Sequence, residues 1–360
     1  MDGLEVKVSV NNILEVFEKD LYKGCKNKKK LYVFERNKVR NINYIYNVLV
    51  SGNYKMNTYN IFLIKHPKYR IVMSLKMNDK IINHYITKHC LIPKLSKYLD
   101  DRNIATRKNM GTDYGVKLIK KYIELNKKYN EFYILKIDIS KFFYNIDHNI
   151  LKSMLYDLDE IEYKLISTII DSTNSSYINE RINSLKNQEL LYTNRVSEVK
   201  DIPNYKEGKG LPIGNLSSQT LGIFYTHKLD HYIGHNLGIK YFVKYMDDYV
   251  LIHHNKEYLK YVLGVIEEKL MREYKLNINK KKTRIYSIME GFEFLGYRFK
   301  VENNKTIISV NNKTYNSIKK RIRYVNKNNN YLFLFSSLNN YYNSFKYCNN
   351  SKIRRYLKMH

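Results

Sequence analysis

Two adjacent acids, Asp247 and Asp248, lie between two short runs of strand-forming residues. Residues 242–245 lead into the pair and residues 249–252 lead out of it, and both runs are rich in aromatic and β-branched side chains, as strands are. The pattern predicts a β-hairpin with both carboxylates at its tip, which is a rigid mount for a divalent metal ion. Aspartate is also a common turn former for local reasons, so the pair needs support from the rest of the chain.

That support comes from Asp138, which ends an apolar run at residues 132–137. Taken alone, this acid could be a strand-end cap. Three carboxylates brought together can hold two Mg²⁺ ions about 3.5–4 Å apart, one activating an attacking hydroxyl and the other stabilising the leaving oxygen of a phosphoryl transfer. Mg²⁺ prefers oxygen ligands. Asp138, Asp247 and Asp248 are therefore the predicted catalytic metal ligands.

The acids belong to an ordered series of motifs that resembles the reverse transcriptases of bacteria and retroelements. Besides the Tyr-Met-Asp-Asp hairpin, the series contains residues 67–71, 105–112, 136–148, 210–219, 281–283 and 292–297. The resemblance implies RNA-directed DNA polymerase activity, a nucleotidyl transfer. It also implies an α+β right-hand polymerase fold with fingers, a palm containing an antiparallel sheet, and a helical thumb.

On this basis the chain divides into four regions. They are an N-terminal extension (1–60), the fingers (61–130), the palm (131–300) and the thumb (301–360). Within the fingers the pattern predicts helices over 79–99 and 114–125. Inside the palm, the polar stretch 172–208 has few apolar anchors and predicts a loop or a mobile hairpin. From Thr306 onward the chain is basic and aromatic, which favours a helical thumb that meets a nucleic-acid duplex, although an ordinary surface helix would look similar.

The resemblance also assigns roles to residues around the acids. Lys68 and Arg70 fall on one face of a strand by its period of two, so both can reach the triphosphate of the incoming nucleotide. Lys282 is a candidate general acid for the departing pyrophosphate, or one member of a solvated basic run. The remaining candidates are Phe142 and Phe143, either of which could be the gate against a ribose 2′-hydroxyl or a core residue, Ile213, Gly214, Gln219 and Tyr245 for substrate, and Ile139 for metal.

Composition agrees with a nucleic-acid partner. Lys and Arg total 63 against 34 Asp and Glu, a net charge of +29, and a phosphate backbone is the natural partner of so basic a chain. The abundance of Lys, Asn, Ile and Tyr, with no Trp and only 4 Pro, also indicates an AT-rich coding sequence, which accounts for part of the charge. No tract reaches membrane-spanning length, no signal peptide is recognisable, and the three scattered cysteines form neither a disulfide framework nor a zinc motif. These observations predict a cytoplasmic protein.

The Ile-Gly-x-x-x-Ser-Gln pattern at 213–219 resembles the reverse transcriptases of diversity-generating retroelements, which copy template RNA with errors concentrated at adenines. The resemblance implies two Mg²⁺ ions, with Mn²⁺ able to substitute, and template RNA, primer and cDNA, deoxynucleotides and a small basic accessory protein as partners. Lys80 and Asn343 depart from the usual pattern. The alternatives are a reverse transcriptase of antiviral defence against phage and a catalytically idle RNA-binding protein, against which the complete set of three acids argues.

Overall fold

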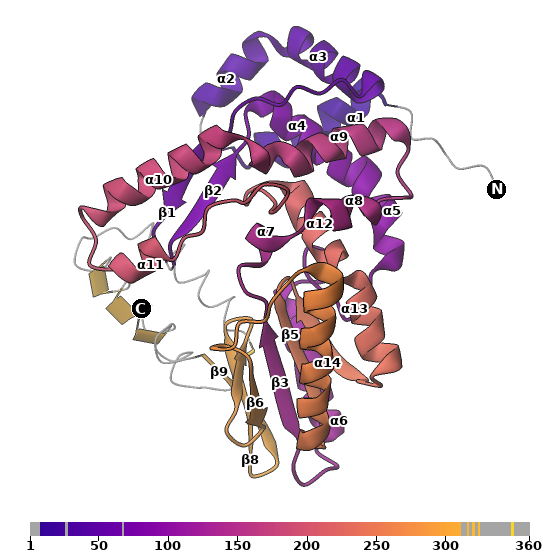
Figure 1. The fold of residues 1–360 in the computed structure, drawn as a ribbon, viewed down its shortest axis with the longest axis vertical. Coiled ribbons are helices and arrows are strands. Elements are labelled where there is room, and N and C mark those ends of the chain that lie inside the picture. Colours follow the sequence, from indigo (N-terminus) through magenta and orange to yellow (C-terminus); the bar gives the residue numbers. More distant parts are fainter. Residues whose placement is uncertain are drawn as a thin grey trace, which may run out of the picture. The chain divides into compact units, whose positions relative to one another are not determined.

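The computed structural model describes residues 8–25, 28–66 and 68–310, with the short pieces 315–316, 319–320, 323–324 and 347–348. The chain forms two compact units. Unit 1 contains Met1–Asp100, Ile139–Leu229 and Lys269–Asn277, and unit 2 contains Asp101–Asp138, Asp230–Glu268 and Ile278–His360. Helices and antiparallel strands make up both units (Figure 1), which confirms the predicted α+β class.

Unit 1 is largely helical. Its elements are α1 (Val10–Glu15), η1 (Val16–Tyr22), α2 (Lys28–Arg36), α3 (Lys38–Ser51), β1 (Asn60–Ile64), β2 (Arg70–Ser74), α4 (Met77–Ile86), η2 (Thr87–Leu91), α5 (Ile92–Leu95), η3 (Ser96–Tyr98), α7 (Phe142–Asn145), α8 (His148–Ser153), α9 (Glu160–Asp171), η4 (Ser172–Asn174), α10 (Ser176–Leu190), α11 (Val196–Lys200) and α12 (Leu216–Tyr225). The helix predicted over 79–99 is confirmed as the nearly continuous run from α4 to η3.

Unit 2 contains the main sheet. Its elements are α6 (Thr112–Asn126), β3 (Tyr133–Asp138), η5 (Tyr232–Asn236), β4 (Tyr241–Tyr245), β5 (Asp248–His253), β6 (Arg284–Ser287), β7 (Phe292–Phe294), β8 (Tyr297–Glu302) and β9 (Lys305–Ser309). Two further helices, α13 (His227–His231) and α14 (Lys256–Tyr274), contain residues of both units. The helix predicted over 114–125 is confirmed as α6, whose apolar stripe Val116, Ile119 and Ile123 is fully buried, as the 3.6-residue period requires.

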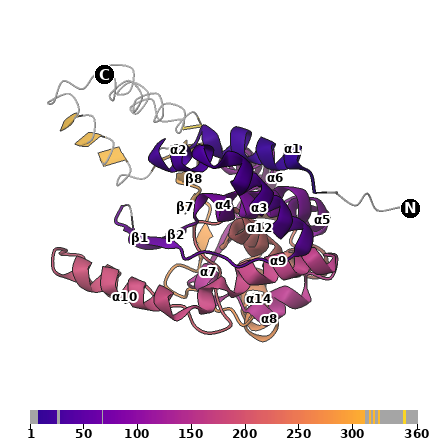
Figure 2. The same cartoon turned by 90° about the horizontal axis from the view of Figure 1, so that it is seen from above.

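The hairpin β1–β2 of unit 1 depends on a helix for its stability. The two strands pair in antiparallel register from Asn60↔Ser74 to Ile64↔Arg70 and form a sheet of their own, and an isolated two-stranded hairpin is marginal in water. Helix α10 lies alongside the hairpin in both views (Figures 1 and 2) and packs against β1. The shared core consists of Tyr59, Ile61, Ile71, Met73, Leu75, Ile178, Ile182, Val199, Ile202 and Tyr205.

This packing overturns the prediction for residues 172–208. The stretch contains α10 and α11 in place of a loop or mobile hairpin. Its apolar residues are few, but Ile178 and Ile182 are spaced by four and fall on one face of α10, where both are fully buried. One stripe of this kind is enough when a neighbouring sheet accepts it. The helical arm, as we name residues 176–200, is therefore part of the fold of unit 1.

The sheet of unit 2 has the strand order β4–β5–β3–β6, and every neighbouring pair is antiparallel. A second, three-stranded sheet has the order β7–β8–β9. Strands β8 and β9 occupy residues 297–302 and 305–309, so the start of the stretch predicted as a helical thumb is strand. Most of the later predicted thumb residues lie outside the described part of the chain. Within the described residues, no helix is both long and apolar enough to cross a membrane.

Truncating the anchor of the arm should destabilise unit 1. Ile182 has no exposed surface, so Ile182→Ala removes buried methyl groups and leaves a cavity, and the free energy of unfolding should fall by about 2–5 kcal/mol. Leu191→Ala is the matched control, because Leu191 follows the same helix but is 77% exposed. Urea unfolding followed by circular dichroism measures both. A control variant as unstable as Ile182→Ala would contradict the packing.

Candidate active site

The predicted hairpin at Asp247 and Asp248 is present in unit 2. Strands β4 and β5 pair from Tyr241↔Ile252 to Tyr245↔Asp248, which leaves Met246 and Asp247 as the two-residue turn. Met246 has a φ of +57°, the left-handed conformation that tight hairpin turns require. The turn therefore presents Asp247 at the tip, and Asp248 opens β5.

Asp138 lies directly opposite Asp248. Strands β3 and β5 pair in antiparallel register along their full lengths, ending at Asp138↔Asp248, and directly paired residues have Cβ atoms about 4.5–5.5 Å apart. The register thus brings the three predicted acids to one end of one sheet. Tyr245 pairs with Asp248 from the other side and packs against the core of unit 2.

A short loop places Lys282 at the same end of the sheet. The backbone N–H of Asn279 donates to the carbonyl of Asp138 at 2.7 Å, and the N–H groups of Lys282 and Thr283 both donate to the carbonyl of Asn279. The hydroxyl of Thr283 accepts the N–H of Asp138 at 3.3 Å. Lys282 Nζ then reaches Asp138 Oδ1 at 2.6 Å. The predicted general acid and a predicted metal ligand are thus an ion pair.

A buried carboxylate supports the hairpin from the opposite face of the sheet. Asp230 accepts a hydrogen bond at 2.9 Å from Lys244 Nζ and one at 2.8 Å from the hydroxyl of Tyr249, two residues that are paired across β4 and β5. A third, from Asn103 Nδ2, is 3.0 Å long. Asp230 and Lys244 are both fully buried, so a buried charge network joins the two strands one residue before the Tyr245↔Asp248 pair.

The segment that carries Asn103 is itself attached to β4. The N–H of Lys244 donates to the carbonyl of Arg102, and the N–H of Ile104 donates to the carbonyl of Lys244. Both edges of the hairpin therefore have backbone partners, because β5 is paired with β3 on the other side. This isolated backbone bridge between Asn103 and Lys244 restrains the outer edge of the hairpin.

The acids fit a divalent cation by their chemistry, but not without rearrangement. Burial, together with the neighbouring charge of Asp248 and then that of Asp138, raises the pKa of Asp247 to about 6, which is the effect expected of crowded carboxylates and one that a bound cation would relieve. Among the described residues, however, no group of three or more acidic, histidine or cysteine side chains is arranged to hold a metal. Binding would require a different arrangement of the three carboxylates and would require Lys282 to release Asp138.

The predicted nucleotide-contacting residues Ile213 and Gly214 lie in unit 1 against β2. The carbonyl of Ile213 accepts the N–H of Met73 at 2.8 Å. Gly214 has a φ of +127°, and a Cβ there would lie 2.4 Å from the Met73 carbonyl oxygen. The close approach that requires this glycine is therefore to the protein backbone. Gly214 also lines a pocket of about 120 Å³ together with Lys80 and His84.

The two candidate gate residues both lie against helix α12 in unit 1. A Cβ on Gly222 would stand 3.2 Å from the ring of Phe143 and 3.4 Å from the ring of Phe142. Phe142 is buried, with 2% of its surface exposed, whereas Phe143 is half-buried. The glycine thus makes room for both rings, and Phe143 has the more accessible surface. Gln219 lies on the same helix and is half-buried.

The remaining predicted residues are separate from these groups. Lys68 and Arg70 are exposed at the turn between β1 and β2, as the triphosphate-binding role requires. The side chain of Ile139 is buried, so only its backbone could contact a metal.

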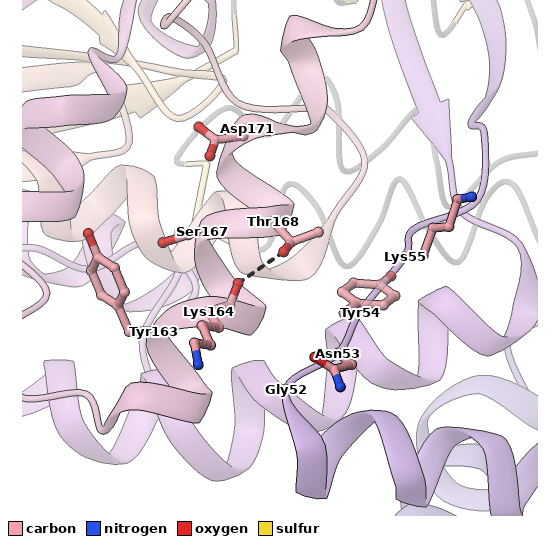
Figure 3. A pocket seen from close by; sticks show the side chains of 9 residues that line it. All are labelled: Gly52, Asn53, Tyr54, Lys55, Tyr163, Lys164, Ser167, Thr168 and Asp171. Carbon is pink, nitrogen blue, oxygen red and sulfur yellow. Dashed lines mark hydrogen bonds between the residues drawn. The ribbon is translucent and has the colours of Figure 1, made fainter.

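A separate concavity in unit 1 lacks the predicted site residues. Figure 3 shows it between α9 and the chain that follows α3, with a volume of about 570 Å³. It is lined by Gly52, Asn53, Tyr54, Lys55, Tyr163, Lys164, Ser167, Thr168 and Asp171. The Thr168 hydroxyl donates to the carbonyl of Lys164 at 3.0 Å, and Asp171 forms an ion pair with Lys152 at 2.5 Å. Among its lining residues, the buried Ser167 hydroxyl has no hydrogen-bond partner in the structure.

Comparison with protein families identifies the family of this chain. Residues 63–299 match the family model described as "Reverse transcriptase (RNA-dependent DNA polymerase)". The chain belongs to the reverse transcriptase family. The enzymes of this family are RNA-directed DNA polymerases, which are nucleotidyltransferases, and the right-hand polymerase fold predicted from the motifs is the fold of the family. The matched segment contains every predicted site residue of this reverse transcriptase family member.

Solved structures that match part of this chain include telomerases. The apo telomerase of Candida tropicalis truncated from its C-terminal domain matches with 13% identity and a TM-score of 0.47, over 71% of this chain and 55% of the other. Telomerase of Candida albicans in complex with a fragment of telomeric RNA matches with 14% identity and a TM-score of 0.46, over 85% of this chain and 59% of the other. The chain thus spans about half the length of these structures. No curated protein matches it significantly.

The sequence motifs of this reverse transcriptase family member did not identify the network around Asp230. Its one visible signal is Lys244, a charged residue between the apolar Val243 and the aromatic Tyr245 in a strand. A lysine in such a position must find a buried partner. Nothing in the pattern indicates that the partner is Asp230, which lies on α13.

Removing the charge of Asp230 should destabilise the β4–β5 hairpin. Asp230→Asn leaves the ammonium group of Lys244 buried without its counter-ion, and breaking a buried pair in this way costs about 3–5 kcal/mol of unfolding free energy. The double variant Asp230→Leu with Lys244→Met should recover much of that loss, because it removes both charges. Glu257→Gln, in the exposed pair with Lys260, is the matched control and should leave the urea midpoint unchanged. Equal midpoints for wild type and Asp230→Asn would contradict the role of the network.

Proposed function

We propose that this chain copies an RNA template into complementary DNA. The observation that carries the proposal is the pairing of Asp138 with Asp248 beside the turn residue Asp247, which gathers three carboxylates at the end of one rigid sheet. Membership of the reverse transcriptase family supports the same reaction. The ion pair of Lys282 with Asp138 adds a protonated amine at that end of the sheet.

Asp138, Asp247 and Asp248, with the backbone of Ile139, would hold divalent metal ions, of which Mg²⁺ is our proposal and Mn²⁺ a substitute. Such ions activate the attacking hydroxyl and stabilise the departing oxygen. The protein's own contribution is the backbone position of the three acids, which the strand pairing fixes, and the amine of Lys282 beside Asp138. Once Asp138 turns away from it, that ammonium group is free to donate to the pyrophosphate, which is the act of a general acid.

The charge distribution of unit 1 supports binding of nucleotide and template. Lys68 and Arg70 would hold the triphosphate, and Phe143, or else Phe142, would exclude the 2′-hydroxyl. A groove of about 810 Å³ is lined by Lys29, Lys30 and Lys76 and by five asparagines, with no acid among its described lining residues. Lysines suit phosphates, and amide groups suit the edges of bases.

We further propose that the enzyme is an error-prone member of a diversity-generating retroelement and works with a small basic accessory protein in the cytoplasm. The support is the Ile-Gly-x-x-x-Ser-Gln pattern at 213–219. A branched apolar side chain at Ile213 cannot make the hydrogen bonds of a glutamine, so discrimination of the nascent base pair would depend more on base pairing alone.

Loss of one acid should abolish polymerisation. Asp247→Asn keeps the size of the side chain but removes a charged ligand, so primer extension on an RNA template should fall by several orders of magnitude while template binding persists. Asp101→Asn, at an acid whose side chain is 89% exposed, is the matched control and should keep full activity. Steady-state extension with Mg²⁺ measures both. An Asp247→Asn protein that retains a tenth of the wild-type rate would reject the assignment.

The residue at 213 should set fidelity. Ile213→Gln introduces a polar side chain whose contact with the base pair can contribute about 1–3 kcal/mol of discrimination, or roughly tenfold to more than a hundredfold. Misincorporation opposite adenine should therefore fall while correct extension persists. Ile161→Gln on α9, where the isoleucine is 39% exposed, is the control. Deep sequencing of cDNA made on one template compares the errors. Equal error spectra would remove the retroelement assignment and leave a defence enzyme as the alternative.

A further inference from the structure

The turn between β1 and β2 is held by the helical arm through charged and aromatic side chains. The fingertip loop, as we name it, comprises residues 65–69 together with Arg70, the first residue of β2; Pro67 lies outside the described residues. Glu189 on α10 accepts a hydrogen bond from the Tyr69 hydroxyl at 2.8 Å and pairs with Lys65 Nζ at 2.5 Å. The Thr193 hydroxyl is 2.7 Å from the same Tyr69 oxygen.

A second contact comes from Arg195, which precedes α11. Its Nη1 donates to the carbonyl of Lys65 at 2.9 Å, and its guanidinium lies 4.5 Å from the centre of the Tyr69 ring. Glu198 holds the other side of the guanidinium, accepting from Nε at 2.7 Å and from Nη2. A planar fork fixed on one side in this way is pre-organised for its remaining contacts. Both ends of the arm's connecting turn therefore hold the fingertip loop.

These contacts contribute little to the free energy of unfolding. Their main effect is on the orientation of the fingertip loop. The side chain of Lys65 is 55% exposed, and partly exposed ion pairs contribute little to the free energy of unfolding. The tip of a two-stranded hairpin would otherwise be its most mobile part. Glu189 retains only 9% of its side-chain exposure, and Lys65 and then Tyr69 hold the pKa of that carboxylate below its usual range, so it remains a charged acceptor for both donors.

We propose that the helical arm is a brace that sets the fingertip loop in the conformation in which Lys68 and Arg70 bind the triphosphate, with Glu189 and Arg195 as positioning residues. Tyr69 lies between the two cationic residues in sequence. Tyr69 contacts the arm, whereas Lys68 and Arg70 on either side of it are exposed, so the contacts of Tyr69 leave both cationic side chains accessible. The inference rests on the proposed polymerase function and extends it to residues that do not touch the substrate.

Neutralising Glu189 distinguishes a positioning role from a purely electrostatic effect on the nucleotide, because the two predict opposite changes in the KM for the nucleotide. Glu189 is an acid near a loop that would bind a polyanion, so its neutralisation would by charge alone tighten nucleotide binding. Neutralisation also makes Glu189 a weaker acceptor for Tyr69 and Lys65. If the arm acts as a brace, the fingertip loop would then be released and nucleotide binding would weaken. The two effects move the KM for the nucleotide in opposite directions.

The test is steady-state extension of a DNA primer on an RNA template with Glu189→Gln and with Glu180→Gln as the matched control. Glu180 lies on the same helix and is exposed. For Glu189→Gln we expect the KM for the deoxynucleotide to rise about tenfold, the effect of losing one charge-assisted hydrogen bond. The kcat at saturating nucleotide, the Kd for primer–template and the thermal midpoint should stay at wild-type values. Tyr69→Phe should raise KM in the same direction, and the double variant should add little, because the two residues form one contact.

Each outcome bears on the inference. A KM for Glu189→Gln that is unchanged or lowered overturns the brace, and so does a fall in kcat and thermal midpoint together, which indicates a purely structural contact. A Glu180→Gln protein with the same KM change overturns it as well. Extension by wild type and control but no effect of Glu189→Gln rejects the inference alone. Absence of any extension by the wild-type chain rejects the proposed function and the inference with it.

Discussion

The carboxylate of Asp230 holds the two strands that carry the acids of the site. It accepts hydrogen bonds from Lys244 on β4 and from Tyr249 on β5 without any exposure to solvent. The opposite face of the same strands carries a crowded set of acids, in which burial and the neighbouring carboxylates raise the pKa of Asp247 to about 6. Like charges at a hairpin tip repel each other, so the strands on either side of the turn must be held rigidly. The buried network holds these strands, at the cost of placing a charge pair in the core.

The charged contacts of the two units differ in what they achieve. The pair of Asp230 and Lys244 is fully buried, so losing one partner leaves an uncompensated charge and lowers the free energy of unfolding. The pair of Glu189 and Lys65 is partly exposed, so its loss costs little stability and acts on the orientation of a loop. Unit 1 needs such a contact because β1 and β2 form a sheet of only two strands, which depends on α10 for its core and on the arm for the position of its tip.

The candidate site was predictable where it is encoded locally. An alternation of apolar and aromatic residues around Asp247 specifies a hairpin, and a strand that ends in an acid specifies the place of Asp138. Polar composition misled the prediction for 172–208, because Ile178 and Ile182 suffice as anchors only when a sheet is present to receive them. Gly214 was expected from the motif, but the structure shows that its nearest constraint is the carbonyl of Met73. The partner of Lys244 could not be found from sequence, since Asp230 lies on a helix that precedes the strand.

The sequence by itself determined the family and the strands, and it supplied the three candidate acids, because side-chain period and turn chemistry act over a few residues. Only the tertiary structure decided that Asp138 faces Asp248, that Lys282 pairs with Asp138, and that a polar insertion folds into an arm against the fingertip loop. These contacts join residues that are far apart in the chain, and their energies depend on burial and register. Both are properties of the packed molecule, which no local pattern contains.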